Sequence, residues 1–478
     1  MSREHPNDDY PSDQSIPDAW RDEMDLARRY ATSGPRYTSY PTAPQFTPEF
    51  DLQRYKNWQA GTPRRSEALS LYVHLPFCRD ICYYCACNKI VSRKPGLAAE
   101  YLEHLFSEIA LQSALVGRER PITQMHWGGG TPTYLDGGQI TELMHVLASN
   151  FRLLDKGYRE YSIEIDPRTV TPTTIALLKG VGFNRVSLGI QDFDDRVQKA
   201  VNRVQPYAQV AELVESVRAH GFRSMSFDLI YGLPYQDHYS MAETLRRVIS
   251  LRPDRIACYN YAHLPERFLP QRSIDRHTLP EPEEKLLMAQ MIAATLRDAG
   301  YRLIGMDHYV LPGDDLALAR REDRLQRNFQ GYSLRIAEDI LGLGMSSISQ
   351  IGDFYLQNAR GLDEYTALTG EGLLPVTRGY LMKREDKLRR HIIMSLICAL
   401  RLDIEECEVE FGICFNEHFA GALDSLRRAE ADGLLKISRD SLTVTEIGRP
   451  FLRNICMPFD AYLADQATSG STRFSATI

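Results

Sequence analysis

Residues 78–87 read CRDICYYCAC, so four of the nine cysteines of the chain lie within one ten-residue segment. Cys78, Cys82 and Cys85 are spaced four and three residues apart. Three thiolates on one loop can hold a [4Fe–4S] cubane and leave its fourth iron open to chelate a substrate. An odd cysteine count with one tight group is a poor disulfide framework and is typical of metal binding in a reducing compartment.

Two other metal sites use cysteine groups of this kind. A structural zinc site takes four ligands, usually as two Cys-x-x-Cys-like pairs far apart in sequence, and no second pair follows here. A ferredoxin-type cluster for electron transfer is the other alternative, although its cysteine spacing differs.

The composition is that of a folded protein. The 478 residues are 43% hydrophobic and 25% charged, which predicts one large domain and a smaller one. The net charge of −7 argues against nucleic acid as a partner. The most apolar run, 392–400, is far shorter than the ~20 residues of a membrane span, so no membrane partner is expected. Residues 1–20 are polar, resemble no signal peptide and are expected to be a disordered tail, which favours the cytoplasm.

A strand–helix rhythm begins near residue 70 and follows a lead-in segment, 21–70. Helices are expected, for example, at Leu97–Leu115 and Tyr207–His220. The alternation predicts an α/β fold with a parallel sheet, and about six units favour a complete or partial β/α barrel (TIM-like) over residues 71–374. The expected strands are Leu71–Leu75, Ile122–Trp127, Tyr161–Ile165, Arg185–Ile190, Met225–Tyr231 and Arg255–Tyr261.

Polar and glycine residues gather where these strands end, which is where β/α barrels place their chemistry. The cysteine loop follows the first expected strand. The ends of the next five carry, in order, Gly128–Thr131, Glu164 with Asp166, Gln191, Asp228, and Ala262-His263.

Residues 375–478 predict a small, mainly helical C-terminal domain. Helices are expected at Lys383–Leu402 and Glu417–Ala431, and a wing-like hairpin at Leu434–Ile437 and Leu442–Thr445. A DNA-binding winged helix is the alternative, but the acidic balance and the lack of a basic helix disfavour it.

The cysteine loop after a first strand, with GGGTP at 128–132 after the second, resembles the radical S-adenosylmethionine (SAM) superfamily. The resemblance sharpens to the oxygen-independent coproporphyrinogen III oxidases and runs from about Ala27 to the C-terminus. Its motifs are GPRYTSYPT (34–42), LYVHLPFC (71–78), CACNK (85–89), HWGGGTPTYL (126–135), Gln191–Phe193, VNR (201–203), DLIYGLP (228–234), NYAHLP (260–265), GMDH (305–308), RNFQGY (327–332) and RNICM (453–457).

This resemblance implies an enzyme that converts two propionates of coproporphyrinogen III to vinyl groups, giving protoporphyrinogen IX for haem synthesis without oxygen. It implies one [4Fe–4S] cluster on Cys78, Cys82 and Cys85 and two SAM molecules. Because SAM on the fourth iron leaves no position for a fourth thiolate, Cys87 is expected to be a catalytic residue that serves substrate geometry, second-SAM geometry or a hydrogen transfer; packing beneath the loop is the plainer alternative. The resemblance further implies a monomer reduced by flavodoxin or ferredoxin. The implied contacts of the first SAM are Tyr72, Gly129, Glu164 and Ile348; those of the second are Tyr84, Gly130, Thr131, Gln191, Arg203, Asp228 and Ala262.

Plainer roles are open for several of these residues. Glu164 and Asp228 could cap helices, and Arg203 could be a surface ion-pair partner. Ile348 and Ala262, taken alone, would be packing residues. The substrate carboxylates need cationic partners, for which Arg36 and the basic segment 383–390 are candidates.

Two departures from the family pattern are visible, since members carry Gly where Ala86 stands and often Phe where Tyr84 stands. A methyl group at 86 disfavours positive φ in the cofactor loop and bears on the second SAM. Two alternative functions remain. One is a haem-binding chaperone related to the family, whose members typically lack the cysteine at position 87 and the GPRYTSYPT segment. The other is a radical SAM enzyme that acts on another tetrapyrrole.

Overall fold

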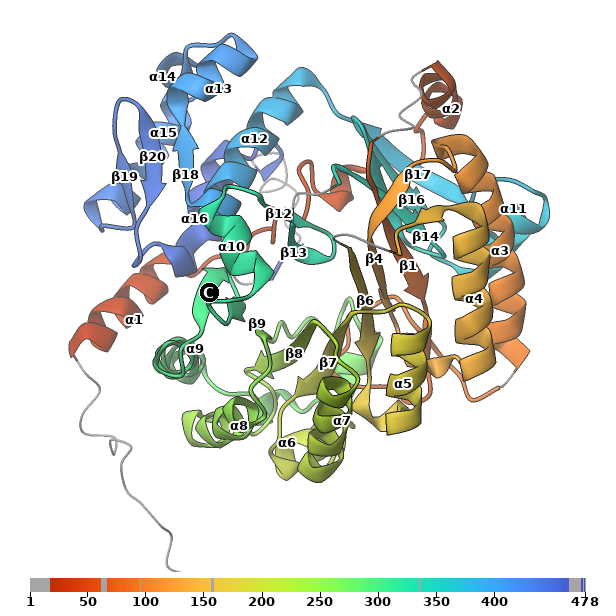
Figure 1. Ribbon diagram of the computed structural model, residues 1–478. Helices are drawn as coiled ribbons and strands as arrows, with labels where there is room; N and C mark the ends of the chain where they lie inside the picture. The colour runs from red at the N-terminus through yellow and green to blue at the C-terminus, as the bar shows by residue number, and fades with distance from the viewer. Residues whose placement is uncertain are drawn as a thin grey trace, which may run out of the picture.

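The computed structural model of the protein describes residues 18–61, 67–94, 96–155, 159–334, 337–463, 474–475 and 477 (Figure 1). Most of the expected disordered tail, residues 1–17, lies outside the described residues. The last three residues of that tail begin helix α1 (Asp18–Tyr30). No helix in the described ranges is both long and apolar enough to cross a membrane.

The core of the fold is a curved sheet with parallel strands, as the alternating pattern predicts. Seven strands pair parallel in the order β9-β8-β7-β6-β4-β1-β14. All six expected strands are present, and β14 is an addition. Their bounds are β1 Leu69–Leu75, β4 Pro121–Gly129, β6 Glu160–Ile165, β7 Arg185–Gln191, β8 Ser224–Tyr231, β9 Arg255–Asn260 and β14 Asp339–Leu343.

The barrel is partial. Antiparallel strands extend the sheet at both ends, and within the described ranges no pairing joins β10 to β17. The sheet also runs past the expected domain boundary at 374. One end carries β11 (His308–Val310) and β10 (Arg302–Gly305), and the other carries β15 (Ile348–Ile351), β16 (Phe354–Asn358) and β17 (Val376–Leu381).

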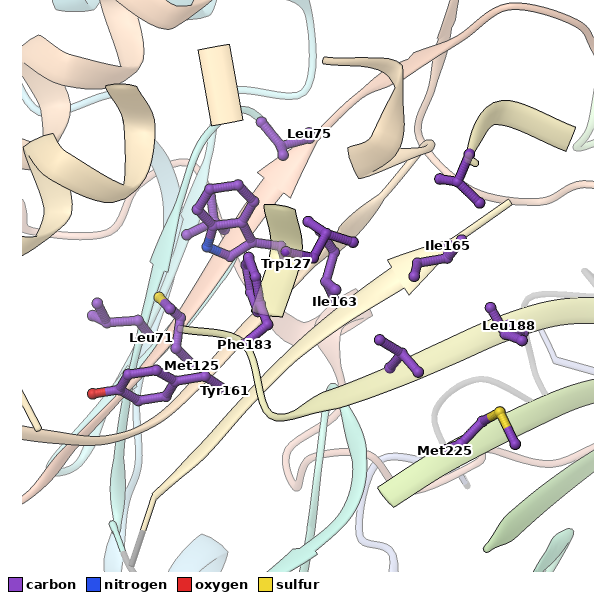
Figure 2. Packing of buried hydrophobic residues seen from close by; sticks show 14 of the residues in the cluster. Leu71, Leu75, Met125, Trp127, Tyr161, Ile163, Ile165, Phe183, Leu188 and Met225 are labelled. Atoms are coloured by element: carbon purple, nitrogen blue, oxygen red, sulfur yellow. The ribbon is translucent and has the colours of Figure 1, made fainter. Parts of the chain in front are cut away.

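Helices cover the outer face of the sheet because every second strand residue there is apolar. Trp127 packs edge-on against Phe183, with ring centroids 5.0 Å apart, inside a cluster that includes Met125 and Ile163 (Figure 2). Capping boxes begin α4, α5 and α8 at Asp136, Thr171 and Asp237. The helix bounds are α3 Gly96–Val116, α4 Gly137–Asn150, α5 Pro172–Gly180, α6 Asp195–Ala200, α7 Tyr207–Ala219, α8 His238–Leu251, α9 Pro282–Asp298 and α11 Leu362–Gly370.

The inner face of the sheet is polar. The alternate, partly exposed positions of β6, β7 and β8 include Glu164, Gln191 and Asp228. The other face of the same strands is buried beneath the helices. The sheet therefore carries partly exposed polar groups on one face only, unlike a parallel sheet that is buried on both sides.

A second hydrophobic core holds the C-terminal region together with the lead-in segment, to which Ala27, Tyr37 and Tyr40 belong. The lead-in also contains α2 (Leu52–Gly61). Short pairs complete the fold: β2 (Phe77–Cys78) with β3 (Ile90–Val91), β5 (Arg152–Leu153) on β4, and the hairpin β12 (Leu325–Asn328) with β13 (Gly331–Leu334), next to α10 (Asp315–Arg321).

Two expected helices of the C-terminal region have different bounds. The first ends at Ala399, because Leu400 is left-handed with φ 58° and the chain then pairs as β18 with β20. The second is broken at Phe419 into α14 and α15. Strands β19 and β20 pair antiparallel at the position of the expected hairpin. The bounds are α12 Arg384–Ala399, β18 Arg401–Asp403, α13 Ile404–Phe411, α14 Phe415–His418, α15 Ala420–Ala431, β19 Leu435–Ile437, β20 Ser441–Val444 and α16 Leu452–Cys456.

Candidate active site

The cysteine loop follows β1 at the carboxyl edge of the sheet. Cys78 lies on β2, which pairs with β3 and folds the loop back on itself. Its Sγ is 3.5 Å from Thr131 Oγ1. Cys82 is buried, Cys85 is half-buried and Cys87 is exposed. The cysteines of this one loop therefore differ in how far they are exposed to solvent.

A hydrogen bond favours the thiolate of Cys85, and two guanidinium groups lie next to Cys82. A hydrogen bond from the Cys87 thiol lowers the pKa of Cys85 to about 6, and the same bond raises the pKa of Cys87. The guanidinium groups of Arg168 and Arg203 each lie 3.5 Å from Cys82 Sγ. Burial raises the pKa of Cys78 to about 11, so ligation must displace the proton of that thiol.

This donor set fits a [4Fe–4S] cubane. Among the described residues, no three His, Cys, Asp or Glu side chains converge on a point that could hold a single metal ion. A cubane does not require convergence, because each thiolate binds a different iron. The two guanidinium groups next to Cys82 can balance the negative charge of a thiolate-ligated cluster.

The glycine segment after β4 packs directly against the cysteine loop. Gly129 has φ 113°, and a Cβ there would lie 2.7 Å from the His74 ring. A Cβ on Gly130 would lie 2.5 Å from the Pro76 carbonyl oxygen. Backbone N–H groups of Gly130 and Thr131 donate to the carbonyl groups of Leu75 and Phe77 at 2.8 Å. These glycines are thus required by the chain's own packing, which brings their backbone beside the first cysteine.

Glu164 and Asp228 lie together on the inner face of the sheet. Glu164 Oε1 is 3.0 Å from His126 Nε2, and Asp228 accepts a hydrogen bond from Ser187 at 3.0 Å. Burial, and then the charge of Glu164, raise the pKa of Asp228 to about 7. Neither carboxylate caps a helix in the described structure, so the capping interpretation is wrong. Two carboxyl groups this close attract an ammonium group or a ribose hydroxyl.

Tyr72 on β1 and Ile348 on β15 lie further along the strand order than this carboxylate pair, toward β14. The Tyr72 ring stacks on His126 with centroids 6.0 Å apart, and its hydroxyl is 3.1 Å from His74 Nδ1. Tyr72 is opposite Gly342 in the sheet register, and a Cβ on Gly342 would lie 2.7 Å from the Ile348 carbonyl oxygen. The backbone of Ile348 is therefore brought next to the β1 position that Tyr72 occupies.

Arg203 is buried and holds several elements together, so the surface ion-pair interpretation is wrong. Its Nη1 lies 3.1 Å from Asp166 Oδ2, and its Nη2 donates to Gly189 O at 2.6 Å. Its Nε is buried without a hydrogen-bond partner in the described structure. Gln191 has φ 67°, and its side-chain amide lies beside Gly189, as Arg203 does. Arg203 and Gln191 therefore meet at the carboxyl end of β7.

Tyr84 and Ala262 are joined by a residue that the sequence motifs do not include. Gln271 is buried, and its amide donates to the carbonyl groups of Tyr84 at 3.0 Å and Ala262 at 3.2 Å. Its oxygen accepts from the N–H of Leu264 at 2.6 Å. Gln271 thus connects the cysteine loop to the segment that follows β9.

Comparison with known proteins decides the family. The superfamily model described as "Radical SAM superfamily" matches residues 72–248, and the "HemN C-terminal domain" matches residues 382–451. The "Oxygen-independent coproporphyrinogen III oxidase" of Pseudomonas aeruginosa is 48% identical over 461 residues, covering 96% of this chain and 100% of that protein. The chain belongs to the oxygen-independent coproporphyrinogen III oxidase family. The Escherichia coli member is 45% identical and covers 93% of this chain and 96% of its own length.

The solved structure of the E. coli coproporphyrinogen III oxidase (HemN), a radical SAM enzyme, has the same fold. It matches with a TM-score of 0.86 and 45% identity, over 89% of this chain and 97% of that one. Membership of the oxidase family and of the radical SAM superfamily implies a [4Fe–4S] cluster and SAM for this chain.

Sequence reasoning missed three polar residues of this oxidase-family site: His126, Arg168 and Gln271. His126 and Glu164 both occupy inward positions of strands, so alternation along β4 and β6 could have identified His126. Arg168 pairs with Asp166, two residues before it, at 2.7 Å and lies 3.5 Å from Cys82 Sγ, a contact that its own sequence position does not indicate. Gln271 lies in a loop with no pattern of its own, and its role depends on contacts 187 residues apart in sequence.

Proposed function

We propose that this protein oxidises coproporphyrinogen III without oxygen, converting two propionate side chains to vinyl groups and giving protoporphyrinogen IX for haem synthesis. The observation that carries this proposal is the three-thiol loop at the carboxyl edge of a partial barrel, in a chain that matches the oxidase family over nearly its whole length. When bound, the cluster and SAM supply the carbon radical that removes hydrogen from a propionate.

In this proposal Cys78, Cys82 and Cys85 hold the cluster, and one SAM lies beside them. Tyr72, Gly129, Glu164 and Ile348 are the proposed contacts of that SAM. The Glu164 carboxylate supports this assignment, since it is partly exposed on the inner face and can accept from an ammonium or hydroxyl group.

We assign a second SAM to the neighbouring group of residues. The buried Nε of Arg203, which has no partner in the described structure, supports the binding of an anionic group there. The bond from Gln271 to Tyr84 and Ala262 supports a common site for the loop and the β9 end. The proposed contacts are Tyr84, Gly130, Thr131, Gln191, Arg203, Asp228 and Ala262.

We assign to Cys87 a role in turnover other than cluster ligation. A cubane with three thiolates and SAM on the fourth iron has no position for a further thiolate. Cys87 is exposed, and its thiol hydrogen-bonds to Cys85, so it lies at the edge of the cluster site. It can serve substrate geometry, second-SAM geometry or a hydrogen transfer.

The remaining assignments concern the electron donor, the oligomeric state and the cellular compartment. We propose reduced flavodoxin or ferredoxin as electron donor. Exposed Arg79, Arg93 and Lys94 near the cluster loop support an acidic partner, although Arg93 is paired with Asp80. We further propose a monomer in the cytoplasm.

Product analysis tests the central proposal. Anaerobically reconstituted protein, supplied with SAM, a reductant and coproporphyrinogen III, is expected to form protoporphyrinogen IX, measured as protoporphyrin after oxidation. A haem titration on the same preparation tests the chaperone alternative. A full cluster with no vinyl product, together with stoichiometric haem binding, would favour the chaperone.

A further inference from the structure

Three aromatic side chains from separate strands form a continuous row at the β9 end of the sheet. The rings of Tyr259 and His308 meet edge-on with centroids 5.9 Å apart, and those of His308 and Tyr332 at 5.2 Å. Tyr332 belongs to the hairpin β12–β13, which packs against α10 and α12 (Figure 1). This aromatic row joins the hairpin to β9 through β11.

Arginines lie over both ends of the aromatic row. The Arg36 guanidinium is 5.7 Å from the Tyr259 ring centroid, and that of Arg327 is 4.6 Å from the Tyr332 centroid. Arg36 also lies 3.5 Å from the Asp307 carboxylate. A third arginine, Arg453, is nearby but committed, since it donates to the carbonyl groups of Pro35 and Gly34 and so clamps the lead-in segment.

Arg327 has no counter-ion of its own among the described residues. Its residue is 7% exposed, and its Nε and Nη1 are buried without a hydrogen-bond partner in that part of the chain. Asp307 is the acidic group next to it, and that carboxylate already pairs with Arg36 and with His308 at 2.7 Å. A buried guanidinium without an anion is costly. The motif segments that carry these residues, GPRYTSYPT, GMDH and RNFQGY, have no part in the cluster or SAM site described above.

This cationic site is close to the cofactor site. In the sheet register Asp228 is opposite Ala257, two residues before Tyr259 on the same face of β9. Burial and then the Asp228 charge raise the pKa of Tyr259, in keeping with this register. Tyr259 therefore lies one strand from Asp228 and has Arg36 over its ring.

We propose that Arg327, assisted by Arg36, binds a propionate carboxylate of the tetrapyrrole, with the aromatic row Tyr259, His308 and Tyr332 beside its pyrrole rings. This inference rests on the proposed function and names its substrate anchor. The anchored carboxylate is one that the product retains. Its loss as carbon dioxide would leave Arg327 again without a counter-ion.

Binding of the substrate with and without its carboxylate charges tests the anchor. The variants are Arg327→Gln, Arg327→Lys and, as a matched control, Arg324→Gln, which removes an exposed arginine three residues away. Each cluster-loaded variant is titrated anaerobically, without reductant, with coproporphyrinogen III, with its tetramethyl ester and with SAM. Iron content confirms that each variant is folded.

Arg327→Gln is expected to weaken binding of the free acid roughly ten- to a hundredfold and to leave the affinities for ester and SAM unchanged. Arg327→Lys should recover part of the loss, since it keeps the charge but not the planar fork. Unchanged binding of the acid by Arg327→Gln would overturn the anchor, and so would an equal loss for SAM. If wild-type enzyme makes the vinyl product in either case, the proposed function stands while the anchor fails. Absence of product from wild-type enzyme contradicts the proposed function itself.

Discussion

Glu108, a fully buried carboxylate on α3, is predicted to hold the turn that leads to Ile348. It accepts hydrogen bonds from the Gly344 N–H at 2.8 Å, from the Asn358 amide at 2.6 Å and from the Tyr365 hydroxyl at 2.6 Å. The Asn358 amide also donates to Gly344 O at 2.8 Å. Gly344 begins the connection from β14 to β15, so the carboxylate fixes the approach of β15 to β1.

The cost of removing this acceptor can be worked from the contacts. Glu108→Ala removes the acceptor of two buried donors, the Gly344 N–H and the Tyr365 hydroxyl, each at a cost of about 1–3 kcal/mol, whereas the Asn358 amide keeps its bond to Gly344 O. Burial raises the pKa of Glu108 to about 7 despite these donors, so loss of the charged group returns about 3 kcal/mol near and above that pH. We therefore expect Glu108→Ala to lower the free energy of unfolding by about 1 kcal/mol at pH 7.

Glu108→Gln isolates the charge, and its effect depends on pH. The folded-state pKa of about 7 is above the ordinary glutamate value of 4.5, so the folded protein binds the extra proton and loses stability as pH rises between these values. The Gln variant lacks this dependence. The stability of wild type minus that of Glu108→Gln should therefore fall by about 3 kcal/mol between pH 4.5 and pH 8.

Urea unfolding across this pH range measures both variants, with the exposed Glu103→Gln on the same helix as the control. SAM titration of the cluster-loaded protein then reports whether the turn before Ile348 has moved, and we expect weaker binding for Glu108→Ala. An Ala variant as stable as wild type would refute the reasoning. The reasoning would also be refuted if the stability of wild type minus that of Glu108→Gln rose with pH.

Three further outcomes are expected of the cysteine loop. Replacement of Cys78, Cys82 or Cys85 with Ser should abolish the cluster; full iron content in all three variants would exclude this ligand set. Cys87→Ser should keep its iron and its SAM-induced spectral change yet form little protoporphyrinogen, whereas normal yield would make Cys87 a packing residue. Air should remove iron and activity together, both restored by anaerobic reconstitution; unchanged turnover in air, with no iron lost, would rule out an open iron.

The repeating part of the fold was predictable because it depends on local pattern. Strand–helix alternation gives the six strands from β1 to β9, each within a few residues of its observed bounds. Strand β14, the seventh parallel strand, is a short apolar segment. It follows the hairpin β12–β13, so the strand–helix alternation does not lead up to it. Its partner, β1, is about 270 residues earlier, so only tertiary pairing identifies it.

The same difference between local pattern and long-range contact separates the site residues that could be predicted from those that could not. The ligand cysteines could be predicted because their spacing within one loop is itself the signal. The contacts of Arg203 with Asp166 and of Gln271 with Tyr84 could not, since they join segments far apart in sequence. Polarity alone does not separate such buried side chains from surface ones, which is why Arg203 allowed a surface interpretation.

The most direct test of the radical mechanism follows one hydrogen atom. Coproporphyrinogen III carrying deuterium on the propionate β-carbons is turned over anaerobically with unlabelled SAM, and the 5′-deoxyadenosine is analysed by mass spectrometry. The mechanism predicts deuterium in 5′-deoxyadenosine, formed together with the vinyl product. Vinyl product accompanied by unlabelled 5′-deoxyadenosine, or formed without consumption of SAM, would contradict it.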